Sequence, residues 1–171
     1  MINEKLFCPD SIAIIGASDN IMKPGGKIIK NLIDNRFAGK LFPVNPHRTV
    51  IQGINTYQKV EELPRTDLAV LAIPALHCLH AVKVLAEDKN TRAFIIISAG
   101  FGETGEDGKE REKKIVDIID KHNACLIGPN CIGVMTPCHT SVFTTPIPKL
   151  TPDGCDFISG SGATTVFIVE S

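Results

Sequence analysis

The sequence has no excess of positive charge, no tryptophan and no long apolar run. Its 18 Lys and Arg are balanced by 19 Asp and Glu, so the charge pattern typical of a nucleic-acid-binding protein is missing. No segment approaches the roughly 20 apolar residues that cross a bilayer, and the N-terminus lacks a basic head followed by an apolar core. We therefore expect no nucleic-acid partner, no membrane partner and a cytoplasmic location.

Aromatic residues and metal-ligand motifs are also scarce. Aromatics make up 5% of the chain, and the largely aliphatic apolar fraction favours a parallel sheet buried on both faces. The five histidines show no metal-ligand spacing, so we predict no metal site. The cysteines form no Cys-x-x-Cys pair, and we expect them to be reduced thiols. They are Cys8, Cys78, Cys125, Cys131, Cys138 and Cys155.

Short apolar runs alternate with segments of helical periodicity. The runs are residues 12–15, 41–44, 68–73, 94–97 and 125–127, and the helical segments lie near residues 28–33, 79–86 and 115–119. The length and β-branching of the runs favour buried strands. Such alternation predicts right-handed βαβ units in an α/β fold with a doubly wound parallel sheet. Its ligand site is expected at the carboxyl ends of the strands.

The composition divides the chain into three parts. Residues 1–135 contain the predicted sheet and its helices. Residues 136–153 include four prolines that interrupt any helical period, and we interpret them as an interdomain linker. Residues 154–171 predict a strand, a glycine turn and a helix. The last part is therefore expected to be the start of a second α/β domain.

The first predicted strand leads into a glycine-containing loop. Gly16, Ala17 and Ser18 follow the strand, and Gly25 and Gly26 stand where the next helix is expected to begin. Free backbone N–H groups and the positive end of a helix dipole suit a diphosphate. The spacing is not that of the Gly-x-Gly-x-x-Gly dinucleotide fingerprint, and a glycine turn without ligand is the alternative.

The second predicted strand leads into Asn45, Pro46, His47 and Arg48. An NAD-dependent enzyme normally has an acidic residue here for the ribose hydroxyls, and none is present. The forked donors of Arg48 suit a ribose-bound phosphate, as found on NADP and on coenzyme A. An exposed turn residue is the alternative for Arg48.

Two further loops offer apolar or small residues. Ile73 and Pro74 precede a predicted helix, and Pro74 either forms part of a lip for an adenine or pantetheine arm or simply starts the helix. Ser98, Ala99 and Gly100 end another strand, where small side chains allow a ligand to approach the backbone.

The remaining candidate residues are polar. Asn130, in a Gly-Pro-Asn turn, is suited to binding an amide-containing ligand, or it stabilises the turn itself. Ser159, Ser161 and Gly162 form a possible second phosphate site at a helix start. Their spacing excludes the Gly-x-Ser-x-Gly elbow of serine hydrolases.

Five stretches in order resemble one family, the acyl-CoA synthetases that form a nucleoside diphosphate, which include the succinyl-CoA synthetase α subunit. They are residues 11–18 (SIAIIGAS), 42–46 (FPVNP), 96–105 (IISAGFGETG), 128–133 (GPNCIG) and 158–163 (ISGSGA). The resemblance covers nearly the whole chain. It implies a Rossmann-like coenzyme A-binding domain followed by the beginning of a flavodoxin-like phosphohistidine domain.

The resemblance also implies roles for the loop residues. It places Gly16, Ala17 and Ser18 at the coenzyme A diphosphate, and Asn45, Pro46 and Arg48 beside the adenosine and its phosphate. Ile73 and Pro74 would border the nucleotide and the arm, Ser98, Ala99 and Gly100 would line the pantetheine path, and Asn130 would lie near the reactive end. Ser159, Ser161 and Gly162 would stabilise a phosphohistidine.

Enzymes of this family pass a phosphoryl group from ATP or GTP to a histidine and then to an acyl carboxylate, which coenzyme A attacks. None of the five histidines here matches that position, so we assign no catalytic residue and expect no catalysis by this chain alone. ATP or GTP with Mg would be handled by an ATP-grasp domain or subunit outside this sequence. A homo-oligomer is left open.

Two departures and two alternatives accompany this interpretation. Gly160 stands where the family commonly has a larger polar residue, and Ser98-Ala99-Gly100 replaces the acidic version of succinyl-CoA synthetases, which favours the acyl-CoA synthetase branch. One alternative is a non-catalytic coenzyme A-binding or sensing module, for example one fused to an acetyltransferase. The other is an NADP-binding oxidoreductase or sensor.

Overall fold

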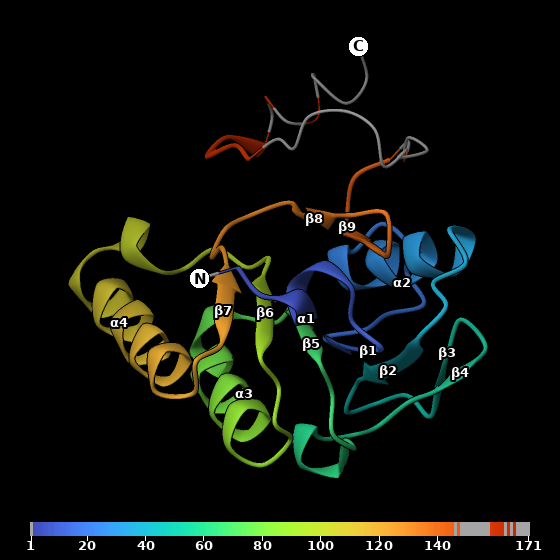
Figure 1. The fold of residues 1–171 in the computed structure, drawn as a ribbon, viewed down its shortest axis with the longest axis horizontal. Coiled ribbons are helices and arrows are strands. Elements are labelled where there is room, and N and C mark those ends of the chain that lie inside the picture. The colour runs from blue at the N-terminus through green and yellow to red at the C-terminus, as the bar shows by residue number, and fades with distance from the viewer. Residues whose placement is uncertain (1, 146, 148–157, 163, 165, 167–171) are drawn as a thin grey trace.

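A five-stranded parallel sheet forms the centre of the protein in the computed structural model, which describes residues 2–145, 147, 158–162, 164 and 166 (Figure 1). The strands are β1 Ser11–Ile15, β2 Lys40–Val44, β5 Leu68–Leu71, β6 Ala93–Ile96 and β7 Cys125–Ile127. Their spatial order is β2-β1-β5-β6-β7, and every neighbouring pair is parallel. The predicted α/β sheet is confirmed.

Helices cover both faces of the sheet (Figure 1). They are α1 Glu4–Phe7, α2 Pro24–Asp34, α3 Ala75–Glu87 and α4 Glu106–Lys121, with the short 3₁₀ helices η1 Val60–Glu62 and η2 Gly102–Thr104. Side chains of α3 and α4 pack in one apolar cluster with Ala69 and Phe94, whereas α2 packs in the other with Ile12 and Val70. The sheet is therefore doubly wound.

The central strands are buried because both of their faces are covered. All residues of β1, β5 and β6 are buried, which explains their nearly continuous aliphatic sequence. The periodicity of α2 has the same origin, since Ile28, Ile29 and Leu32 are fully buried against the sheet.

Two hairpins extend the domain. One joins β3 Val50–Ile51 to β4 Ile54–Asn55 through Gln52 and Gly53, which both have positive φ. The other joins β8 Gly133–Met135 to β9 Thr140–Val142. Thus β9 lies in the stretch interpreted as a linker.

The described residues 136–145 pack on the first domain. The buried Asn31 of α2 donates from Nδ2 to the Val142 oxygen at 2.7 Å and to the Thr144 oxygen at 3.1 Å, and accepts at its own backbone oxygen from Thr140 Oγ1. Thr136 Oγ1 donates to the Phe7 oxygen at 2.9 Å. Residues 136–145 are therefore in close contact with α1 and α2 of the first domain. The domain boundary after residue 135, the linker at residues 136–153 and the second domain at residues 154–171 stay predictions.

The expectation that all cysteines are reduced is wrong for two of them. Cys8, after α1, and Cys138, in the turn of the β8–β9 hairpin, form a disulfide with their Cα atoms 5.2 Å apart. They are 130 residues apart in sequence, and the fold brings them together because Thr136 and His139 of the hairpin bond to backbone oxygens of α1. Cys78, Cys125 and Cys131 are free thiols.

His139 is buried beside that disulfide. Its Nε2 lies 2.8 Å from the Leu6 backbone oxygen and its Nδ1 lies 2.9 Å from Ser141 Oγ. Burial lowers the pKa of His139 below its usual value of 6.5, and the bond to the Leu6 oxygen opposes this shift. A neutral imidazole therefore joins α1 to β9.

The beginning of the second predicted unit is described only in part. Gly162, Thr164 and Val166 have helical backbone, whereas Asp156 and Phe157 of the strand predicted before them lie outside the described residues. Within the described residues, no helix combines the length and the hydrophobicity that a bilayer crossing requires.

Candidate ligand site at the carboxyl edge of the sheet

The chain leaves β1 and β5 toward opposite faces of the sheet, to α2 and α3 respectively. Such a divergence between adjacent parallel strands opens a crevice at their carboxyl ends. The loops after β1 and β5 touch there, since the Ala72 N–H donates to the Ile15 oxygen and an added Cβ on Gly16 would lie 2.9 Å from Ile73 Cγ2. Gly16 and Ile73, both candidate site residues, thus lie beside each other.

The β1 loop requires glycine at three positions. Gly16 has a φ of +89°, in the left-handed region that disfavours other residues. A Cβ on Gly25 would overlap the Gly16 oxygen, and one on Gly26 would overlap the Asn20 oxygen and lie 2.8 Å from the Ser18 oxygen. The first turn of α2 therefore packs directly against the loop backbone.

Two side-chain amides hold the carbonyl groups of this loop. Asn45 Nδ2 donates to the Ala17 oxygen at 2.8 Å, and Gln52 Nε2 donates to the Ser18 oxygen at 3.0 Å. In a trans peptide the N–H points opposite to the C=O, so the N–H groups of Ser18 and Asp19 point away from these amides. Neither N–H has a hydrogen-bond partner among the described residues. The loop thus presents two unpaired donors.

Arg48 lies in an exposed segment after β2. Asn45 fixes the start of this segment, because its Oδ1 accepts from the His47 N–H at 2.8 Å while its Nδ2 holds the β1 loop. Pro46 and Arg48 are exposed, and Arg48 makes no ion pair in the part of the chain that the structure describes. Its guanidinium is therefore available to an anion.

The β5 and β6 loops are joined to each other. Ile73 is half-buried, Pro74 is exposed and caps α3, and Ser98 Oγ donates to the Ile73 oxygen. Gly100 has a φ of +107°. The Asn130 N–H donates to the Ser98 oxygen at 3.1 Å, which brings the Gly-Pro-Asn turn to the same edge. The predicted residues of four loops therefore lie at one edge of the sheet.

Two charged residues on and near α4 hold the Ser98-to-Gly100 loop. The Glu103 carboxylate accepts from the N–H groups of Gly100 at 2.6 Å and Phe101 at 3.1 Å. These bonds lower the pKa of Glu103, and the bond from Gly100 has the largest effect. Arg111 Nη1 donates to the Gly100 oxygen at 2.6 Å. These N–H groups are already paired, so this loop offers small side chains to a ligand.

Asn130 has a φ of +55°, a conformation that asparagine tolerates better than most residues. Its side chain has no hydrogen bond among the described residues, and the residue is exposed. The neighbouring Cys131 is a packed thiol, with Sγ 3.3 Å from the Ile96 oxygen, and burial raises its pKa. Asn130 is therefore available to a ligand, whereas Cys131 is poorly suited as a nucleophile.

Of the predicted residues Ser159, Ser161 and Gly162, the last lies against Ile132, two residues after Asn130. The Ser161 N–H donates to Ser159 Oγ at 3.0 Å, and an added Cβ on Gly162 would lie 2.5 Å from Ile132 Cγ2. The Thr164 N–H approaches Ser161 Oγ at 3.4 Å, as in the first turn of a helix. A phosphate role for these residues stays a prediction.

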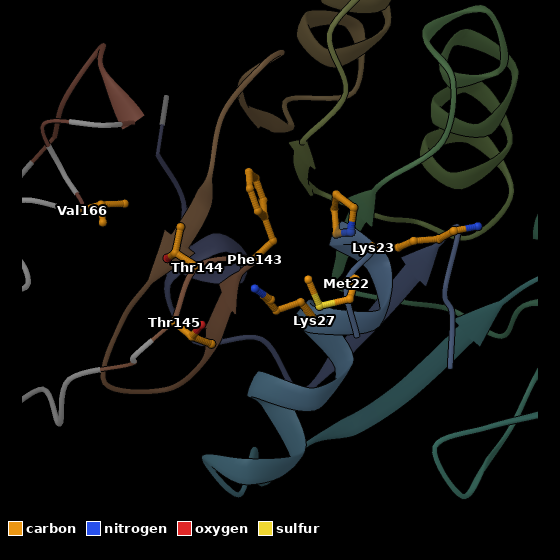
Figure 2. Close-up of a pocket in the computed structure, with 8 residues that line it drawn as sticks. Met22, Lys23, Lys27, Phe143, Thr144, Thr145 and Val166 are labelled. Atoms are coloured by element: carbon orange, nitrogen blue, oxygen red, sulfur yellow. The ribbon is translucent and has the colours of Figure 1, made fainter. Parts of the chain in front are cut away.

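A cavity of about 390 Å³ adds residues that the sequence analysis missed (Figure 2). It lies between the start of α2 and the chain after β9, and its lining residues are Met22, Lys23, Pro24, Lys27, Phe143, Thr144, Thr145 and Val166. Lys27 extends toward residues 143–145, whereas Lys23 extends away from them (Figure 2). Their i, i+4 spacing at the start of a helix was the available signal. Both lysines add positive charge beside the β1 loop.

The fold and the loops are those of a Rossmann-like domain with unpaired backbone donors at the carboxyl edge of its sheet. The family model described as CoA binding domain matches residues 10–137. The chain therefore belongs to the CoA-binding domain family.

Curated relatives are coenzyme A ligases. The chain is 39% identical over 164 residues to the "Acetate--CoA ligase [ADP-forming] II subunit alpha" of Pyrococcus furiosus, with 95% of this chain and 35% of that protein covered. It is 34% identical to the "4-hydroxybutyrate--CoA ligase [ADP-forming]" of Nitrosopumilus maritimus, with 99% of this chain and 24% of that protein covered. Similarity to a succinate–CoA ligase α subunit of Archaeoglobus fulgidus is weaker, at 28%. The chain spans about a third or less of the first two relatives' length.

Solved structures agree with this placement. The crystal structure of PH0766 from Pyrococcus horikoshii superposes with a TM-score of 0.87 at 36% identity, with 99% of this chain and 38% of that one covered. The acetyl-coenzyme A synthetase 1 of Ca. Korarchaeum cryptofilum, in complex with phosphate and ADP, gives a TM-score of 0.80 at 29% identity. That superposition covers 98% of this chain and 36% of the synthetase chain. The chain thus corresponds to the coenzyme A-binding part of ADP-forming acyl-CoA synthetases.

Proposed function

We propose that this chain binds coenzyme A as part of a nucleoside-diphosphate-forming acyl-CoA synthetase. The observation that carries the proposal is the pair of unpaired N–H groups on Ser18 and Asp19, presented at the point where β1 and β5 diverge. Backbone donors in a glycine loop before a helix bind phosphate groups, and the coenzyme A diphosphate is such a ligand. The residues present therefore fit the group.

The other loops supply the remaining parts of the proposed site. The exposed Arg48 would pair with the ribose phosphate, since a guanidinium binds phosphate through two donors. Ile73 and Pro74 would border the adenine and the arm, and Ser98, Ala99 and Gly100 would line the path of the pantetheine. Asn130 would receive the end of the arm. The ligand itself supplies the reactive thiol.

The whole protein's reaction is a further part of the proposal. An acid, coenzyme A and ATP or GTP would give an acyl-CoA, a nucleoside diphosphate and phosphate, by way of a phosphohistidine and an acyl phosphate. ATP or GTP with Mg would be bound by an ATP-grasp domain or subunit, and the phosphohistidine would approach Ser159, Ser161 and Gly162. The named relatives support this assignment, because they are ADP-forming CoA ligases. We also propose a cytoplasmic location.

Calorimetric titration of the protein with coenzyme A, dephospho-coenzyme A, NADP and NAD at one salt concentration tests the proposal. We expect coenzyme A to bind most tightly and dephospho-coenzyme A to bind more weakly. Tighter binding of NADP than of coenzyme A would contradict the proposal and favour an NADP-dependent oxidoreductase or sensor.

A further inference from the structure

Gln52 connects the β3–β4 hairpin to the β1 loop through three hydrogen bonds. Its Nε2 donates to the Ser18 oxygen at 3.0 Å and to the Gly26 oxygen at 2.8 Å. Its backbone N–H donates to Asp19 Oδ1 at 2.9 Å. One residue therefore binds both the loop that follows β1 and the first turn of α2.

The hairpin places Gln52 firmly in this position. Gln52 has a φ of +48° and Gly53 a φ of +82°, which are the left-handed conformations of a tight two-residue hairpin turn. Ile51 before the turn is fully buried in the cluster that contains α2. The left-handed conformation is unfavourable for glutamine compared with glycine or asparagine. A glutamine there is accounted for by the bonds of its side chain.

We infer that Gln52 is a positioning residue for the proposed coenzyme A site, an inference that rests on the proposed function. By holding the Ser18 oxygen, Gln52 turns the N–H of the same peptide group, which belongs to Asp19, away from the hairpin. By holding the Asp19 carboxylate at its own backbone N–H, it also keeps that negative charge on the hairpin side of the loop. The loop thereby presents the Asp19 N–H, and not the Ser18 oxygen, to a phosphate group.

The side chain can be tested separately from the backbone. Asparagine is better suited to a positive φ but is one methylene shorter, so Gln52→Asn is expected to fold as well as the wild type while losing at least one of the two carbonyl bonds. Gln52→Gly removes the side chain on an even more favourable backbone. Gln52→Glu keeps the length but directs a carboxylate at two carbonyl oxygens. Gln58→Ala, at an exposed position, is the matched control.

We expect Gln52→Asn to weaken binding of coenzyme A by about tenfold. Loss of the bond to the Ser18 oxygen also releases the orientation of the Asp19 N–H, and one hydrogen bond corresponds to about that factor in affinity. Dephospho-coenzyme A should lose affinity by the same factor, since it retains the diphosphate, and the melting temperature should not fall. Gln52→Glu should bind more weakly still, and Gln58→Ala should bind as the wild type does.

Three results would overturn the inference. One is wild-type affinity for coenzyme A in both Gln52→Asn and Gln52→Gly. Another is an equal loss of affinity in Gln58→Ala. The third is weaker binding of coenzyme A with unchanged binding of dephospho-coenzyme A, which would place Gln52 at the ribose phosphate. A wild-type protein that binds neither ligand would instead contradict the proposed function, and the role of Gln52 with it.

Discussion

Asn31 donates from Nδ2 to the Val142 backbone oxygen at 2.7 Å, although the two residues are 111 positions apart in sequence. Asn31 is 3% exposed and Val142 is 2% exposed, so this bond is shielded from water. It fastens β9 to α2. Together with the Cys8–Cys138 disulfide, it holds the described residues 136–145 against α1 and α2.

Replacement of Asn31 by alanine is therefore expected to destabilise the protein. The change leaves the buried Val142 oxygen without its donor, which costs about 1–3 kcal/mol, and removes the bond to the Thr144 oxygen as well. Urea unfolding should show a loss of about 2 kcal/mol or more. Asn55→Ala is the control, because Asn55 is exposed and its side chain makes no hydrogen bond within the described residues.

The disulfide is expected to add stability that reductant removes. It closes a loop of 130 residues, and cross-links typically stabilise by about 2–4 kcal/mol by restricting the unfolded chain. The melting temperature of the wild type should fall when dithiothreitol is added. A Cys8→Ser, Cys138→Ser double variant should melt lower and show no response to dithiothreitol. Equal alkylation of the unfolded wild type with and without reductant would show that no disulfide exists.

Stability is expected to fall in mild acid because of His139. Its pKa is lowered in the folded state by burial, so the unfolded state takes up the proton first as pH decreases. The contribution of neutral His139 to stability is complete above about pH 6.5, the usual pKa of histidine. It is lost as the pH falls from there toward the lower pKa of the folded state. Melting temperatures between pH 8 and pH 5 measure this. His139→Gln should melt lower at pH 8 and show a shallower acid decrease, and exposed His77→Gln should leave the profile unchanged.

Arg48 is expected to distinguish coenzyme A from its dephosphorylated form. Arg48→Ala should lower the affinity for coenzyme A by at least about tenfold, since hydrogen bonds to charged groups contribute about 1.5–3 kcal/mol. Affinity for dephospho-coenzyme A should stay unchanged. Arg65→Ala provides the control, because Arg65 is exposed and precedes β5, at the opposite edge of the sheet. Equal losses for both ligands would assign Arg48 a different role.

The sequence predicted the sheet well because its strands are buried on both faces. A run such as residues 68–71 is apolar at every position, and Gly16 and Pro74 mark where a strand gives way to a helix. The gathering of Ser98, Ile73 and Asn130 at one edge also followed from parallel topology alone.

The features that the sequence analysis missed are contacts between segments far apart in the chain. Pairing of Cys8 with Cys138 depends on how the chain returns after β8, which no local pattern records. Residues 136–153 were interpreted as a linker because of their prolines, and the pairing of β9 with β8 within that stretch was not foreseen. Gln52 was overlooked because its side chain bonds to backbone oxygens 26 and 34 residues away.

The most direct test of the central claim is the amide NMR spectrum of the protein titrated with coenzyme A. We predict that the amide signals of Ser18 and Asp19 shift most, because their unpaired N–H groups would donate to the diphosphate. Signals from the Glu103-bound amides of Gly100 and Phe101 should move less. Saturable shifts that spare Ser18 and Asp19, or no shifts at all, would contradict the account.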